Sequence, residues 1–115
     1  MYQISYAENL IDNPSECRDR ERRALEHAIG LLEKAQAAGV RSPAAAEALS
    51  FVSTLWRALV EDLVAPENDL PDVLRADLVS VGVWILKEVD LIRIGRSESF
   101  LGLIEVCAII RDGLK

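Results

Sequence analysis

Apolar residues recur every three or four positions in four stretches of the chain, which predicts four amphipathic helices over about 14–38, 43–64, 71–94 and 98–113. The boundaries carry capping signals: Asn13-Pro14 and Ser42-Pro43 each place an N-capping side chain before a proline. Gly39 and the Ala65-Pro66 pair are typical helix ends. Short connections favour antiparallel neighbours, so the expected fold class is all-α, a small bundle of four main helices.

Residues 1–13 precede the first capping signal and carry no long periodic pattern. We expect either a short N-terminal arm or a helical turn there, and the sequence does not choose between them. At 115 residues the chain is expected to form a single helical domain over residues 1–115.

The third predicted helix is apolar on almost every side. One stripe contains Leu78, Val81, Ile85, Val89 and Ile92. A helix with a second apolar stripe is either central or covered by another molecule, and a small bundle has few helices to surround a central one. The second stripe consists of Val79, Val83, Leu86 and Ile94, with Trp84 and Leu91 near its edge.

Two explanations of the second stripe remain open. Either it packs under residues 2–12 and the fourth helix, or it is exposed and forms a groove or a dimer interface. Exposed apolar patches on soluble proteins usually mark such contacts. Trp56 and Trp84 have the same two interpretations, with core packing as the default. Gly82 inside the helix indicates close approach of a neighbouring helix.

The net charge of −6 disfavours direct nucleic-acid binding. Arginines cluster at 18, 20, 22 and 23, but acids alternate with them, so ion pairs such as Glu16–Arg20 and Asp19–Arg23 are the expected arrangement. Two distant cysteines and no N-terminal signal favour a reducing, cytoplasmic location. The longest apolar run, 78–86, is too short for a membrane span, which predicts a soluble protein.

Catalytic, metal-binding and cofactor-binding motifs are absent from the sequence. His27 is the single histidine and stands near no nucleophile or carboxylate pair, so a catalytic role would depend on partners supplied by the fold. We therefore expect a protein that is not an enzyme and has no cofactor, and that acts by binding a partner.

Several fragments, taken in order, resemble the flagellar biosynthesis regulator FlaF of alphaproteobacteria. The resemblance extends from Tyr2-Gln3 to Arg111-Asp112-Gly113-Leu114, over nearly the whole chain. The fragments that carry it are Leu55-Trp56, Glu61-Asp62-Leu63, Pro66-Glu67-Asn68-Asp69-Leu70-Pro71, Leu74-Arg75-Ala76-Asp77-Leu78, Ser80-Val81-Gly82-Val83-Trp84-Ile85-Leu86 and Phe100-Leu101-Gly102-Leu103-Ile104-Glu105.

The resemblance implies a cytoplasmic protein needed for flagellin production and filament assembly, acting after transcription alongside the translational repressor FlbT. The first hypothesis is a chaperone whose groove, built from the second and third helices, covers a helical segment of flagellin. An acidic rim of Glu67, Asp69 and Asp72 would border it. The expected contacts are Trp56, Val79, Val83, Trp84, Leu86 and Leu91.

Two alternatives accompany this hypothesis. The protein would instead regulate flagellin translation through the messenger RNA, using Arg18, Arg20, Arg22 and Arg23, or through FlbT. The second apolar stripe would otherwise form a homodimer, which flagellin could displace.

Overall fold

The computed structural model describes residues 14–114. It contains four helices, α2 (Pro14–Ala38), α3 (Pro43–Val64), α4 (Asp72–Arg93) and α5 (Leu101–Asp112). The all-α prediction is confirmed, and the first two helices have the predicted bounds. The expected N-terminal arm or turn falls on residues 1–13, outside the described part of the chain.

Local capping explains why these helix boundaries could be predicted from the sequence. The Ser42 hydroxyl accepts a hydrogen bond from the Ala45 N–H and so caps α3. Gly39 and Gly95 have positive φ values, which glycine adopts without the steric cost of a side chain. After α4, the Arg96 N–H donates to the Leu91 carbonyl and the Gly95 N–H to the Ile92 carbonyl, the pattern of a Schellman motif.

The last helix begins at Leu101, three residues after the predicted start. The Ser99 hydroxyl accepts a hydrogen bond from the Leu101 N–H. The Phe100 N–H instead donates to the Gln36 side chain of α2, at 2.9 Å. Part of the capping thus comes from a residue far away in sequence, which a local pattern does not reveal.

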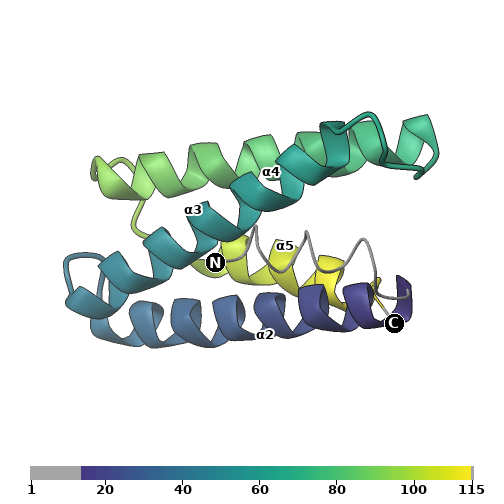
Figure 1. Cartoon of the computed structure of the whole chain (residues 1–115). Coiled ribbons are helices and arrows are strands. Elements are labelled where there is room, and N and C mark those ends of the chain that lie inside the picture. Colours follow the sequence, from purple (N-terminus) through teal and green to yellow (C-terminus); the bar gives the residue numbers. More distant parts are fainter. Residues whose placement is uncertain (1–13, 115) are drawn as a thin grey trace.

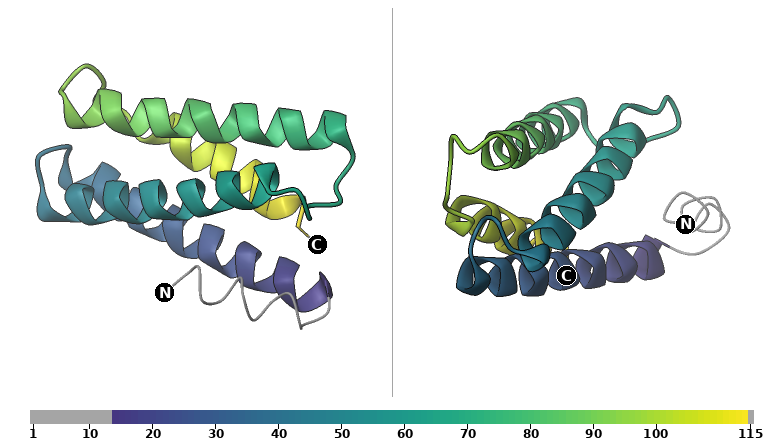
Figure 2. Two further views of the ribbon diagram at one scale, coloured as in Figure 1. Left: turned by 45° about the horizontal axis from the view of Figure 1, so that its top comes forward. Right: turned by 90° about the vertical axis from the view of Figure 1, so that its left-hand side faces the viewer.

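Three helix pairs pack closely: α2 with α3, α3 with α4, and α2 with α5. In Figure 1, α2 and α5 lie along the bottom of the molecule, α4 lies along the top, and α3 runs obliquely from one layer to the other. The end-on view in Figure 2 shows this slope of α3 clearly. Among the described helices, α4 therefore has one close neighbour along its length, α3.

The core lies between α2, α3 and α5 and extends to one face of α4. The first apolar stripe of α4 faces inward: Ile85, Val89 and Ile92 are buried, whereas Leu78 and Val81 are half-buried. The largest fully buried side chains are Leu25, Leu32, Val52, Trp56, Ile85, Val89, Phe100, Leu103 and Cys107.

Gly82 marks the closest approach of α3 and α4, as its position inside a helix predicts. A Cβ atom at Gly82 would lie 2.5 Å from Val60 Cγ2 and 3.3 Å from Trp56 Cε3. Such distances leave no room for a side chain. Glycine thus lets α4 lie directly against the indole of Trp56.

Candidate binding groove

The two helical layers diverge at one end of the molecule and leave a groove of about 350 Å³. Its walls come from the first turns of α2, the last turns of α3, the loop after α3, the first turns of α4, and the last turns of α5. The lining residues are Arg18, Glu21, Leu25, Trp56, Leu59, Asp62, Leu63, Asn68, Leu70, Leu74, Leu78, Ile109, Ile110, Gly113 and Leu114.

The groove is apolar inside and open to solvent along its edge. Ile109 is 68 % exposed and Leu74 is 44 % exposed, and Leu70 is also exposed, although all three line the groove. Large aliphatic side chains that converge on a hollow and remain exposed are typical of a surface that binds a partner.

The loop between α3 and α4 is fixed to the end of α3 by one asparagine. The Asn68 side-chain amide donates to the Asp62 carbonyl at 3.1 Å and to the Asp62 carboxylate at 3.4 Å. Its oxygen accepts a hydrogen bond from the Leu70 N–H at 3.1 Å. These contacts hold Leu70 at the edge of the groove.

Three charged side chains line the groove: Arg18 and Glu21 from α2 and Asp62 from α3. Burial raises the pKa of the Asp62 carboxyl above its usual value, the hydrogen bond from Asn68 opposes this rise, and the charge of Glu67 adds to it. No lysine or arginine within residues 14–114 forms an ion pair with Asp62. The groove thus holds a carboxylate that lacks a cation in the described part of the chain.

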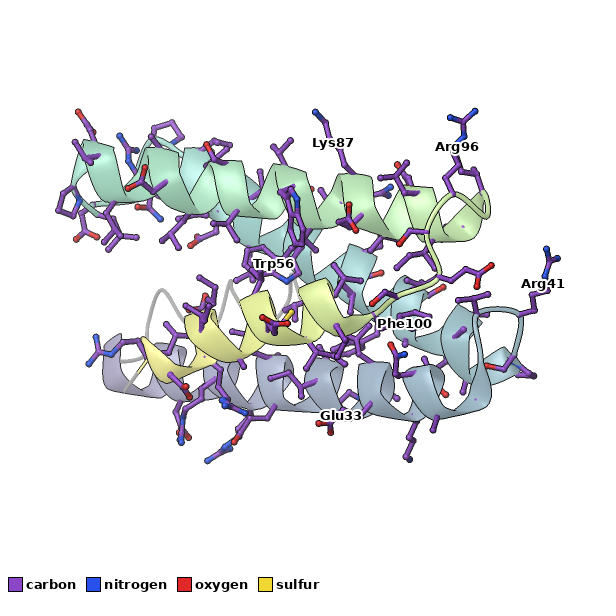
Figure 3. All side chains as sticks on the ribbon, turned by 180° about the vertical axis from the view of Figure 1, so that it is seen from behind. Glu33, Arg41, Trp56, Lys87, Arg96 and Phe100 are labelled. Atoms are coloured by element: carbon purple, nitrogen blue, oxygen red, sulfur yellow. The ribbon has the colours of Figure 1, made fainter. Side chains whose placement is uncertain are left out.

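The predicted contact residues do not share one surface. Trp56 is only 1 % exposed, as the default expectation of core packing predicts: it packs between α4 and α5, as Figure 3 shows, and forms part of the groove floor. Its role as a partner contact stays a prediction. Val83 and Trp84 are exposed, at 43 % and 40 %, and Leu91 is exposed as well. Val79 and Leu86 are half-buried.

Helix geometry explains the separation. Each residue turns the helix by about 100°. Val79 and Leu86 therefore lie on one flank of α4, whereas Trp84 and Leu91 lie on the opposite flank and Val83 faces outward between them. The Trp84 ring lies over Gly102 of α5, where a Cβ atom would come within 3.2 Å of it. Trp84 and Leu91 thus lie at the edge of the second stripe, as expected, and on the far side of Val83 from Val79 and Leu86.

The predicted acidic rim lies at the groove and not beside Val83 and Leu91. Glu67 and Asp69 are exposed on the loop that carries the groove residues Asn68 and Leu70. Asp72 is also exposed and pairs with Arg75 at 2.5 Å. These acids therefore lie near the groove that α3 and α4 help to build, and their role as a rim stays a prediction.

Two arginines of the α2 cluster share one carboxylate. Arg22 and Arg23 both pair with Asp19, the latter at 2.5 Å. The hydrogen bond from Arg22, together with the charge of Arg23, holds the pKa of Asp19 below its usual value. The predicted Asp19–Arg23 pair is confirmed, whereas Glu16 lies among the residues whose side chains are not described. Elsewhere on α2, the His27 ring packs edge-to-face on the Phe51 ring of α3, with 4.8 Å between the ring centroids.

Sequence reasoning missed the residues that line the groove from α4 and α5. Leu70, Leu74 and Leu78 are spaced four residues apart, which is a helical signal, yet Leu74 resembles an ordinary core residue. Ile109 lies on α5, and Leu114 follows its C-cap, Gly113. No sequence pattern reports the angle between two helical layers, and that angle creates the groove.

The fold and the groove define a small helical protein with an open, largely apolar groove. None of the helices within the described residues is long and apolar enough to cross a membrane. The sequence matches the family model for the flagellar protein FlaF over residues 2–114, so the chain belongs to that family. No curated protein and no solved structure matches the chain. Its role is therefore a flagellar one.

Proposed function

We propose that the protein binds a helical segment of flagellin in the cytoplasm and so promotes flagellin synthesis, export and filament assembly. The observation that carries the proposal is the open apolar groove, to which all four helices contribute. Its volume lies within the range of pockets that hold ligands in proteins, about 300–1,000 Å³. An amphipathic helix would bury its apolar face there.

The groove is a better candidate than the outward face of α4. Leu74 of α4 and Ile109 of α5 both line a hollow, whereas Val83 projects from the convex side of a single helix. A concave surface contacts a bound helix from several sides and therefore removes more apolar area from water. Membership in a flagellar protein family makes flagellin the natural client.

The test compares two pairs of substitutions. Leu74→Asp with Ile109→Asp places charges in the groove, and Val83→Asp with Leu91→Asp places them on α4 outside it. All four side chains are exposed in the structure, so both variants should stay folded by circular dichroism. Only the groove variant should lose co-purification with the protein's own flagellin. Equal binding by both variants would refute the groove, and no binding by the wild type would refute the proposed function.

The salt dependence of binding distinguishes the regulatory alternative from the proposed function. Binding to messenger RNA through phosphates should weaken steeply as salt rises, whereas an apolar protein contact should not. A mobility shift with flagellin messenger RNA at low salt would favour direct regulation. Co-purification with a FlbT-like repressor and not with flagellin would favour regulation through that protein.

A further inference from the structure

Asp62 occupies an unusual position for a carboxylate. It lies in the last turn of α3, lines the groove with Leu59, Leu63 and Leu78, and is partly buried. Its side chain accepts one hydrogen bond, the 3.4 Å contact from Asn68. An ionised carboxylate in such surroundings loses much of its hydration and gains little in return.

The surroundings within residues 14–114 do not supply a compensating cation. Arg18, on the α2 wall, is exposed and forms no ion pair with Asp62 among the described residues. Glu21 beside it is itself acidic. The side chains of α4 and α5 that line the groove are all uncharged. The pKa of the Asp62 carboxyl is accordingly raised, chiefly by burial.

The edge of the groove has the same sign of charge. Glu67 and Asp69 are exposed on the loop that borders it and form no ion pair within the described part of the chain. Asp72 is matched by Arg75. An apolar hollow with an unpaired carboxylate inside and two at its mouth is complementary to an apolar helix face that carries basic residues.

The length of the groove sets the size of the occupant. Leu74 and Leu78 lie about one helical turn, or about 6 Å, apart on the α4 wall, and Leu70 of the preceding loop extends this wall further. A bound helix would therefore contact the groove through residues at i, i+3 or i+4, and i+7. One of these positions would lie beside Asp62.

We propose that the groove accepts one amphipathic helix with a single lysine or arginine within its apolar stripe, and that this cation pairs with the carboxylate of Asp62. The inference rests on the proposed function, because it specifies the flagellin segment that the groove would bind. Glu67 and Asp69 attract further basic residues that flank the stripe. Asp62 then determines which helix binds, and the leucines supply most of the apolar contact.

The test uses overlapping 18-residue peptides of the protein's own flagellin. The strongest binder is synthesised again with each lysine or arginine replaced by norleucine, which keeps the aliphatic stem and removes the charge. One replacement should weaken binding to the wild-type protein by roughly tenfold, the value of one charge-assisted contact. The same replacement should change binding to Asp62→Asn by less than about twofold.

Asp62→Asn is nearly isosteric and retains an acceptor for Asn68, so it should remain folded. Glu47→Gln removes one exposed charge at the other end of α3 and serves as the matched control, with binding unchanged. Equal effects of norleucine on the wild type and Asp62→Asn would overturn the inference. A strongest binder without lysine or arginine in its apolar stripe would do the same.

Other occupants give distinct results. If light scattering shows a dimer that Ile109→Asp makes monomeric, the groove holds a second copy and the inference is wrong. A synthetic peptide of residues 1–13 that binds more tightly than every flagellin peptide would also overturn it. Binding of intact flagellin without binding of any peptide excludes a single helix as the occupant. Failure of intact flagellin to bind refutes the proposed function itself.

Discussion

Gly82 allows the packing of α4 on α3 to be measured as a free energy. Replacing a helical glycine by alanine normally stabilises a protein by up to about 1 kcal/mol, because alanine has the higher helix propensity. At Gly82 the added Cβ would lie 2.5 Å from Val60 Cγ2. Overpacking of this kind costs about 1–3 kcal/mol. We expect Gly82→Ala to range from neutral to about 2 kcal/mol less stable.

Gly30 provides the matched control. It lies inside α2, and nothing lies within 4 Å of the position where its Cβ would be. Gly30→Ala should therefore show the propensity gain alone, about 0.5–1 kcal/mol of added stability. The difference between the two variants isolates the cost of the contact, about 1–3 kcal/mol.

Urea denaturation followed by circular dichroism measures both variants against the wild type. Val60→Ala removes Cγ2, the atom that the new Cβ at position 82 would contact. The cost of Gly82→Ala should therefore largely disappear in the Val60→Ala background. If Gly82→Ala and Gly30→Ala stabilise the protein equally, the close approach of α3 and α4 does not constrain Gly82 and the reasoning fails.

Three further predictions concern other contacts. In a Cys17→Ala background, Cys107 should react with a thiol reagent only after unfolding. Burial raises its pKa from 9.0 to about 11, so the free energy of unfolding should fall by about 2–3 kcal/mol as pH rises from 9 through 11, a dependence that Cys107→Ala abolishes. Gln36→Ala should cost about 1 kcal/mol in urea denaturation because the Phe100 N–H loses its acceptor, whereas Gln36→Glu, which keeps an acceptor, should cost less. Ser42→Ala should cost about 1 kcal/mol through loss of the α3 cap, and Ser42→Asp should restore most of it.

The helices were predictable because their signals are local. Ser42 caps α3 with its own side chain, and Gly39 ends α2 through its own backbone conformation. The start of α5 was predicted three residues early because Gln36, 64 residues from Phe100, supplies the acceptor at that point. A boundary can be read from the sequence when the residues that fix it are neighbours in the chain.

The site was predicted less well, for two separate reasons. The angular separation of Val79 from Trp84 on the helix could have been predicted from the sequence, since five residues turn a helix by about 140° beyond a full turn. The groove could not be predicted from the sequence, because it depends on the distance at which α3 holds α4 from α5. The buried indole of Trp56 shows the same limit: its helical position is evident from the sequence, but the helix that covers it is not.

The arrangement of close helix pairs has a mechanical consequence. The order α5–α2–α3–α4 is an open series with α4 at its end, so α4 can tilt about α3 without separating α2 from α5. Such a tilt would widen or narrow the hollow and let one scaffold accommodate side chains of different size. A helix bound between the layers would fix α4 at one angle. Amide hydrogen exchange along α4 should therefore be slower in the complex than in the free protein.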